Sequence, residues 1–474
     1  MGLLRDQIGK WNYGEPKSNK DLGGAMAGEK NDPLEPHSQS MTPVVPSSKR
    51  MQPSFYAAKV KLHQSLLSRM DLAAAETMPS EQLSHVLHDL INQLIDEQSL
   101  PVNNDERRQL ILDLQNEILG LGPLEPLLAD PSISEILVNR YDTVFVERKG
   151  RLEQVPMQFN DDEHLLRIID KIVSRVGRRI DESSPMADAR LPDGSRVNAI
   201  IPPISLDGPT LSIRRFSVVP LRIEDLIQKQ ALTKGMAEFL AAMVAAKTSI
   251  LISGGTGSGK TTLLNILSCF IPEGERIITI EDTAELQLQQ THVVRLETRP
   301  QNIEGKGEVP MRALVRNCLR MRPDRIVLGE VRGSEVIDML QAMNTGHEGS
   351  LTTIHANASR DALSRLENLV SMGGVNMPAK TLRQQISSAI HIVIQTARLT
   401  DGSRKITSIQ EITGMEGDVI VMQEIFTYER TGTGNNGLVL GNFMATGVRP
   451  HVAERIKTWG IQLSDDLFNP GVIE

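Results

Sequence analysis

One short segment limits the folds open to this chain more than any other. Residues Gly254 to Thr261 read GGTGSGKT, in which glycines occupy the first and sixth positions and lysine and threonine follow. The apolar run SILIS precedes this segment, and the helix-like run TTLLNILSCF follows it. A glycine-rich loop between a buried strand and a helix is typical of layered α/β domains, in which the loop leaves a sheet edge and enters a helix N-terminus.

The residue types in this loop match the chemistry of phosphate binding. Glycines allow positive φ and a close approach of backbone N–H groups to a bulky anion, and a helix N-terminus adds partial positive charge. Lys260 also stands where a dinucleotide fingerprint needs its third glycine, which disfavours that reading. We expect ATP as the ligand, with the phosphates reached by Lys260 and Mg²⁺ ligated by Thr261. The predicted binding residues are Gly255, Thr256, Gly257, Ser258, Gly259, Lys260, Thr261 and Thr262.

Composition narrows the function classes. A formal net charge of −8 gives no general attraction to nucleic acid or to anionic lipid, so we expect no direct nucleic-acid partner and membrane contact only through partner proteins. The two cysteines, Cys269 and Cys318, lack the spacing of a zinc site or a disulfide framework, which predicts a reducing cytoplasm and no transition metal. No signal-peptide or membrane-spanning apolar run is visible.

Changes in residue composition and hydrophobic periodicity along the sequence predict five regions in an α/β protein. Residues 1–56 show no sustained period and are interpreted as a disordered tail. Helix-like patterns over 57–122 predict a three-helix bundle, in which the last helix starts near an N-cap at Asn104 or Asp105. Strand-like runs and one amphipathic helix predict a smaller α/β domain over 123–219, followed by a linker, 220–232, and by a P-loop ATPase domain, 233–474.

The pattern of the last region predicts its sheet. The runs TSILISG, RIITIED, RIVLGEV, GSLTTIHA and HIVIQTA are apolar throughout and alternate with helical segments, which is typical of buried, largely parallel strands. Beyond Thr400, alternating runs predict antiparallel strands, and HVAERIKTWG predicts a final helix.

Polar residues follow several of these runs. Glu281, Asp282 and Glu285 follow RIITI, Glu330 follows RIVLG, and His355 ends GSLTTIH. Because the carboxyl ends of parallel strands share one sheet edge, we expect them beside the phosphate loop. For each residue taken alone, a solvated loop, a helix cap or a buried hydrogen bond is an alternative role.

We also make predictions for His347 and for Gly329, which lie in these segments. His347 precedes the GSLTTIH strand, and we interpret it as lying at the same sheet edge as His355. Gly329 stands where an aspartate usually holds Mg²⁺, so we expect Glu330 to contact the metal through water.

Taken together, these segments resemble the secretion ATPase superfamily. The order is a Walker A loop, an Asp box from Glu281 to Glu285, an atypical Walker B ending at Glu330, and a His box from Gly346 to Ala356. The resemblance implies a RecA-like C-terminal domain and a homohexameric motor that hydrolyses ATP for type II secretion, type IV pili or type IV secretion.

The N-terminal half carries a second resemblance. LGLGPLEPLLADPSISEILVN, ADARLPDGSRVNAIIPP and LSIRRF are similar to the companion domain of the CpaF/TadA branch. That resemblance implies catalytic arginines over the nucleotide at Arg196 and at Arg214 or Arg215, where a guanidinium fork suits phosphate. Ordinary surface ion pairs are the alternative role, and Arg332 is a further candidate.

The branch resemblance also implies a function. A tetracysteine zinc module is absent, whereas a tail and helices precede the companion domain, which favours a Flp (Tad) pilus assembly motor. Such a motor is cytoplasmic and peripheral at the inner membrane, where pilus platform proteins are its partners. A type IV secretion traffic ATPase, a nucleic-acid translocase and a nonhydrolysing nucleotide-dependent scaffold are the alternatives, although 3% aromatic residues offer no stacking path for a strand.

The resemblance suggests a division of labour for hydrolysis. In this hypothesis Glu281 orients the attacking water, Glu330 supports Mg²⁺ and water, and His355 senses the γ-phosphate. Companion-domain arginines offset the charge of the transition state. The linker, 220–232, would act as the hinge between the two domains.

Overall fold

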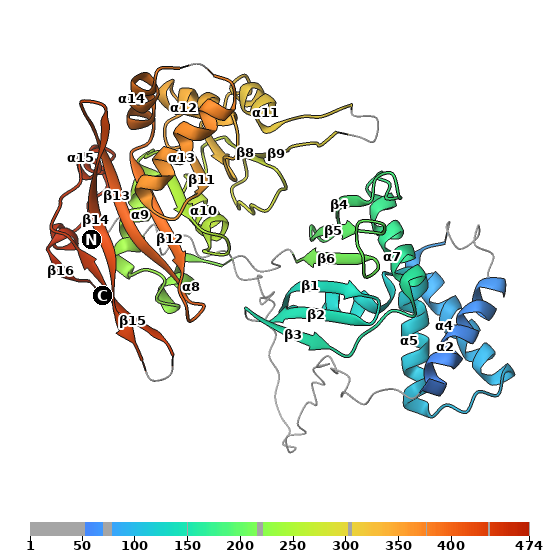
Figure 1. The fold of residues 1–474 in the computed structure, drawn as a ribbon. Coiled ribbons are helices and arrows are strands. Elements are labelled where there is room, and N and C mark those ends of the chain that lie inside the picture. Colours follow the sequence, from blue (N-terminus) through green and yellow to red (C-terminus); the bar gives the residue numbers. More distant parts are fainter. Residues whose placement is uncertain are drawn as a thin grey trace, which may run out of the picture. The chain divides into compact units, whose positions relative to one another are not determined.

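The described residues divide into two compact units, one up to Gly122 and one from Pro123 onward (Figure 1). This computed structural model describes residues 53–69, 78–148, 150–215, 221–301, 306–375, 377–434 and 437–473. Residues 1–52 of the predicted tail therefore lie outside the described residues, and Pro53 begins the first helix. No helix within the described ranges is both long and apolar enough to cross a membrane.

Three helices make up the described part of the first unit: α2 (Pro53–Arg69), α4 (Ser80–Glu97) and α5 (Asn104–Leu119). The N-cap of α5 is Asn103, one residue before the predicted start, because its Oδ1 accepts from the backbone N–H groups of Asp105 and Glu106. The side chain of Glu106 accepts from Asn103 N in return, which completes a capping box. Apolar residues at helical spacing are fully buried between the helices: Leu62, Leu66, Leu87, Ile91, Leu94, Leu110 and Leu114.

The second unit begins with a smaller α/β domain. After the short helix α6 (Glu125–Ala129), the strands are β1 (Ile133–Arg140), β2 (Thr143–Arg148), β3 (Arg151–Val155), β4 (Met186–Arg190), β5 (Arg196–Ile200) and β6 (Thr210–Arg214). They form a sheet of order β3-β2-β1-β6-β5-β4, in which every neighbouring pair is antiparallel. The amphipathic helix α7 (Asp162–Arg175) contacts β4 and buries a stripe of apolar side chains: Leu165, Ile168, Ile169, Ile172 and Val173.

A ten-stranded sheet organises the rest of the second unit, in the order β16-β15-β14-β13-β12-β7-β11-β10-β8-β9. Six neighbouring strands are parallel: β7 (Ile250–Gly254), β8 (Ile277–Glu281), β9 (Val293–Glu297), β10 (Arg325–Leu328), β11 (Leu351–His355) and β12 (Ile392–Arg398). The antiparallel extension is β13 (Arg404–Glu416), β14 (Val419–Thr433), β15 (Val439–Ala445) and β16 (Gly471–Val472). The α/β class and this change from parallel to antiparallel pairing are as predicted.

Helices cover both faces of the ten-stranded sheet (Figure 1). Side chains of α9 (Lys234–Ala245), α10 (Lys260–Ser268) and α15 (Val452–Thr458) join one core, and those of α11 (Met311–Cys318), α12 (Glu335–Asn344), α13 (Ser359–Met372) and α14 (Ala379–Ala389) join the other. Along β7, Ile250 and Ile252 point into the first core and Leu251 into the second. Burial on both faces explains why these strands are apolar without alternation.

The segment predicted as a linker contains a short helix, α8 (Ile223–Gln228). Asp225 accepts a hydrogen bond from the backbone N–H of Arg222, which caps the helix. Ile223, Leu226 and Ile227 pack against the first core, because spacings of three and four place them on one helical face.

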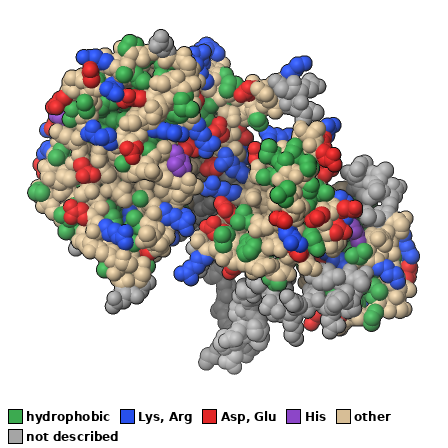
Figure 2. All heavy atoms as spheres, in the orientation of Figure 1, with side chains coloured by type: hydrophobic (Ala, Val, Ile, Leu, Met, Phe, Trp, Pro, Cys, Tyr) green, Lys and Arg blue, Asp and Glu red, His purple; other side chains and the backbone are tan. Residues whose placement is uncertain are grey.

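On the face drawn in Figure 2, acidic side chains lie among the basic ones over both sheet domains.

Candidate active site

The glycine-rich segment forms the connection between β7 and α10, at the predicted position. Gly257 (φ +68°) and Gly259 (φ +97°) adopt the left-handed conformation that L side chains rarely reach. Gly254 is needed for a different reason, because a methyl group there would lie 2.4 Å from the Thr396 hydroxyl oxygen. The loop therefore leads into the N-terminus of a nine-residue helix, where backbone N–H groups favour an anion.

Side chains of the loop are held by the loop itself. Lys260 Nζ donates to the carbonyl oxygen of Gly255 at 2.9 Å, and Ser258 Oγ donates to the same oxygen at 2.9 Å. Burial lowers the pKa of Lys260, and the charge of Glu330 partly offsets that effect. The lysine is therefore a largely buried cation that is held at the loop by backbone oxygen.

A chain of polar contacts joins the loop to β10 and β11. The hydroxyl of Thr256 and Nε2 of His355 share a hydrogen bond of 3.1 Å, and Nδ1 of His355 lies 3.3 Å from Glu330 Oε1. Glu330 Oε2 accepts from Nη2 of Arg332 at 2.6 Å and from its Nε at 2.9 Å. The structure thus brings the predicted residues His355 and Glu330 to the phosphate loop, and their chemical roles stay predictions.

The carboxylate of Glu330 is kept ionised by its surroundings. Burial alone would raise its pKa, but the hydrogen bonds and charge of Arg332, together with Lys260 and His355, lower the pKa below its ordinary value. Arg332 also lies 3.3 Å from Asp282, so its guanidinium bridges two acidic segments of the site. Burial raises the pKa of Asp282.

Glu281 has the opposite environment. The side chain is 3% exposed, and its Oε2 accepts from the backbone N–H groups of Glu285 at 2.7 Å and Leu286 at 3.0 Å. Its Oε1 is buried with no hydrogen-bond partner among the described residues. Burial raises the pKa of Glu281, and the two backbone bonds only partly counter this. A buried acceptor without a partner is a costly feature that marks a place for a ligand or water.

The three arginines predicted from the companion domain have different partners. Arg196 Nη1 donates to Glu285 Oε1 at 2.5 Å, so this arginine contacts the acidic segment after β8. Arg214 is exposed and lies 3.8 Å from Glu135 of β1. Arg215 donates to the backbone carbonyl of Asp130. Contact of these arginines with a nucleotide stays a prediction.

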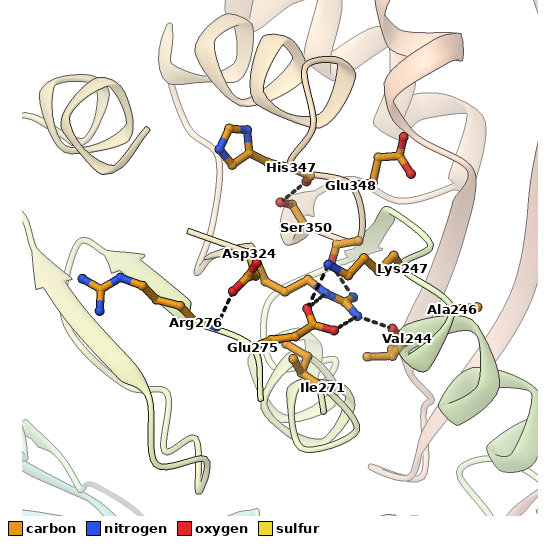
Figure 3. A network of polar contacts seen from close by, with 12 residues as sticks. Val244, Ala246, Lys247, Ile271, Glu275, Arg276, Asp324, His347, Glu348 and Ser350 are labelled. Carbon is orange, nitrogen blue, oxygen red and sulfur yellow. Dashed lines mark hydrogen bonds and ion pairs between the residues drawn. The ribbon is translucent and has the colours of Figure 1, made fainter. Parts of the chain in front are cut away.

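The interpretation of His347 is wrong. His347 precedes β11 and His355 ends it, so the length of a parallel strand separates the two histidines. Figure 3 shows His347 beside Ser350, whose hydroxyl donates to the His347 carbonyl at 2.7 Å. A strand begins and ends at opposite edges of its sheet, and only His355 shares the edge of the phosphate loop.

A buried ionic network at that opposite edge was not predicted (Figure 3). The Arg325 side chain is fully buried, and it donates to Glu275 from Nε at 2.6 Å and from Nη2 at 3.2 Å. It also donates to the carbonyl oxygens of Val244 at 2.8 Å and Gly349 at 3.1 Å. Lys247 lies 3.5 Å from the same glutamate. The only signal in the sequence is an arginine at the head of the apolar run RIVL.

Three residues of the β12–β13 segment that lie at the loop were also missed. Thr396 Oγ1 lies 3.0 Å from Ser258 Oγ, and Arg404 Nε donates to the Gly257 carbonyl at 2.9 Å. Arg398 lies close by, since a methyl group added at Gly257 would be 3.7 Å from its Nη1. No motif marks these positions, because they reach the loop only through the pairing of β12 with β7.

Comparison with known proteins gives a family and relatives. The family model for Type II/IV secretion system proteins matches residues 117–435. A putative conjugal transfer protein of Mycobacterium tuberculosis is 38% identical over 312 residues, which cover 65% of this chain and 88% of that protein. The type IV secretion system protein VirB11 of Brucella suis is 33% identical over 301 residues, covering 58% and 83%. The crystal structure of the Brucella suis VirB11 ATPase with sulphate aligns with 61% of this chain and 93% of that chain, at 32% identity and a TM-score of 0.34.

Proposed function

Because the chain belongs to the type II/IV secretion system protein family, we propose that it is an ATP-hydrolysing motor that works as a homohexamer. Its task is assembly of a Flp (Tad) type pilus at the bacterial inner membrane, which it reaches through platform proteins. One observation carries the ATPase part of the proposal. The phosphate-loop residue Thr256 is joined through His355 to the ionised carboxylate of Glu330 at a single sheet edge.

The residues at this edge fit a nucleotide with Mg²⁺. Left-handed glycines and a helix N-terminus suit the phosphates, and Lys260 reaches them from within the loop. Thr261 would supply a hydroxyl ligand to Mg²⁺, and Glu330 would support the metal, because Gly329 offers no carboxylate. The metal neutralises charge on the phosphates when it is bound.

The two glutamates divide the remaining work. Hydrolysis adds the oxygen of water to the γ-phosphorus, breaks the bond to the β-phosphate oxygen and releases ADP, phosphate and a proton. Oε1 of Glu281, which has no hydrogen-bond partner among the described residues, is a buried acceptor that orients the water, and the ionised Glu330 supports both water and metal. His355 senses the γ-phosphate because it lies between Thr256 and Glu330. Arg196, together with Arg214 or Arg215, offsets developing charge on closure.

The pilus assignment has one supported competitor. The helices before the companion domain and the presence of only two cysteines favour the pilus motor. The names of the relatives, a conjugal transfer protein and a type IV secretion protein, favour a type IV secretion traffic ATPase. Both functions use the same hydrolytic site, so the site alone does not discriminate between them.

Lys260→Ala tests the ATPase part of the proposal. Phosphate release and nucleotide affinity of the full chain should both collapse, because the loop loses its cation. Lys457→Ala, an exposed lysine on α15, is the matched control and should leave both values unchanged. A wild-type hydrolysis rate in Lys260→Ala would overturn the assignment, and stimulation of the wild type by DNA would favour a nucleic-acid translocase.

Deletion of the gene tests the cellular function. Fine surface pili should disappear, and they should return with the wild-type gene but not with Lys260→Ala. Intact pili combined with lost protein secretion or lost DNA transfer would instead establish the traffic ATPase. Complementation by Lys260→Ala in either assay would point to the nonhydrolysing scaffold.

A further inference from the structure

Two arginines face each other at the end of the β12–β13 hairpin. Arg398 is the last residue of β12, Arg404 is the first of β13, and the antiparallel register pairs them directly. Leu399 N donates to Ser403 O at 2.7 Å and closes the turn between them. We call Arg398 and Arg404 the hairpin arginines. Neither belongs to a predicted motif.

The hairpin is anchored to the phosphate loop. β12 lies parallel to β7, with Thr396 opposite Gly254, where the loop begins. The Thr396 hydroxyl oxygen lies 3.2 Å from Ser253 O and 3.0 Å from the buried Ser258 Oγ, so its single proton is donated to one or the other. These contacts fix the end of β12 against both the first and the later residues of the loop.

The hairpin arginines reach the two left-handed glycines of the loop. Arg404 Nε donates to the Gly257 carbonyl at 2.9 Å, and a methyl group added at Gly259 would lie 3.4 Å from Arg404 Cδ. A methyl group at Gly257 would lie 3.7 Å from Arg398 Nη1. Nε of Arg404 and Nη1 of Arg398 therefore lie where the loop turns toward the N-terminus of α10.

The side chains of the hairpin arginines form no ion pair with the described residues. Both side chains are exposed, and neither has a carboxylate within ion-pair distance among the described residues. The turn's own acid, Asp401, uses one oxygen for Ser403 and the other for the backbone N–H of Val439. Those bonds lower the pKa of Asp401 to about 2, so it remains an anion that is committed to the turn.

Adjacent guanidinium groups repel each other unless an anion lies between or beside them. A guanidinium carries five N–H donors in a planar fork, and Arg404 uses one of them in its hydrogen bond to Gly257 O. The remaining donors of the pair suit the oxygens of a phosphate chain. Since these donors lie against the loop, we propose that the hairpin arginines bind the phosphate chain of the nucleotide. This inference rests on the proposed nucleotide binding by the loop.

A structural role is the competing explanation. Arg404 would then only hold the Gly257 carbonyl, and Arg398 would be an ordinary surface arginine. A third possibility is contact with the base or the ribose. These alternatives predict different ligand dependence, because inorganic tripolyphosphate carries the phosphate chain without base or sugar.

The test compares Arg398→Ala, Arg404→Ala and the double variant by calorimetric titration of the full chain with ATP and with tripolyphosphate. Each single change should weaken both ligands about tenfold, and the double change roughly a hundredfold, as expected for charge-assisted hydrogen bonds. Arg430→Ala is the matched control, because Arg430 is exposed on the neighbouring strand β14 and donates only to Thr433 Oγ1 among the described residues. It should bind both ligands like the wild type.

Several results would overturn the inference while leaving the proposed function standing. Wild-type affinity for both ligands in the double variant would assign the pair a structural role. Weaker ATP binding with unchanged tripolyphosphate binding would assign it to the base or ribose. If Arg404→Ala fails to fold by thermal melting, Arg398→Ala decides alone, because the Arg398 side chain makes no hydrogen bond with the described residues. A wild-type chain that binds neither ligand would instead refute the proposed function.

Discussion

Charged side chains lie at both edges of the parallel part of the sheet, but their surroundings differ. We call the edge where these strands begin the amino edge and the edge where they end the carboxyl edge. At the amino edge, Arg325 and Glu275 are paired through two hydrogen bonds, and Lys247 and backbone carbonyls complete the network (Figure 3). At the carboxyl edge, Glu281 is also buried but leaves one oxygen without a partner among the described residues. Protein groups satisfy the Arg325–Glu275 network, whereas Oε1 of Glu281 is left for a water or a ligand to satisfy. Charge content alone therefore does not identify a site.

Glu330→Gln should impair ATP hydrolysis at the carboxyl edge without destabilising the fold. The ATP hydrolysis rate is expected to fall about 10²–10⁴-fold, the range for a lost acid–base group, because the amide retains the shape but not the charge. Thermal unfolding should change little. Glu348→Gln is the matched control at the amino edge, where its carboxylate pairs with Arg455. Equal rates in the two variants would remove Glu330 from the chemistry.

Arg325→Met, at the amino edge, should destabilise the fold without changing nucleotide binding. It leaves Glu275 buried beside Lys247 alone, and removal of one partner of a buried pair costs about 3–5 kcal/mol. The melting temperature of the full chain should drop while nucleotide affinity of the folded protein stays the same. The double variant with Glu275→Leu should recover part of the loss, because no unpaired charge remains. A single variant as stable as the wild type would show that the network is not needed.

Gly349→Ala tests the packing of the Arg325 network at the same edge. Gly349 has φ +78°, and an added methyl group would lie 2.3 Å from Arg325 Nη1. We expect a loss of about 1–3 kcal/mol from the backbone, with a further loss from displacement of the guanidinium. Gly374→Ala is the control, since its φ is +72° but nothing lies within 4 Å of the added group. Thermal melting that does not separate the two variants would contradict this account.

The smallest effect is expected in the pH dependence of the two glutamates. Burial raises the pKa of Glu281, so its ionised form, and with it kcat/KM, should be gained only as pH rises through that raised value. Stability should follow the opposite course, because a raised folded pKa favours folding below the unfolded pKa and loses that contribution as pH rises. Glu281→Gln should remove both trends. An unchanged acid limb in this variant would assign the limb to another group.

Glu330 should behave inversely. Its pKa is lowered in the folded chain, chiefly because Arg332 outweighs the cost of burial. The stability it contributes is therefore present above the unfolded pKa and is lost as pH falls through the lower folded value. Melting curves of wild type and Arg332→Ala at acid pH measure this contribution.

Local patterns were enough to predict the phosphate loop and five of the six parallel strands, whereas the partly buried strand β9 was missed. Both depend on residues that are neighbours in the chain, and apolar runs without alternation reflect burial on both sheet faces. The capping residue of α5 was misplaced by one position, because Asn103 and Asn104 carry the same side chain and only geometry decides which oxygen receives the N–H groups. The helix α8 was missed because it is too short for a visible period.

Contacts between distant segments could not be predicted. Arg325 and Glu275 are 50 positions apart, and Ser258 and Thr396 are 138 apart, so no spacing rule connects them. Their meeting depends on the strand order, in which β12 joins β7 although four other strands intervene in the chain. His347 shows the converse error, since nearness in sequence to His355 does not bring it to the same edge.

Gly329 gives the site a constraint of its own. An added methyl group at this position would lie 3.0 Å from Cγ of Glu281, tighter than most such contacts. The glycine after β10 and the buried glutamate that ends β8 are therefore packed closely together. A lineage that acquired an aspartate here would be expected to alter the glutamate as well, so the two motifs would be inherited together and exchanged together rather than drift independently.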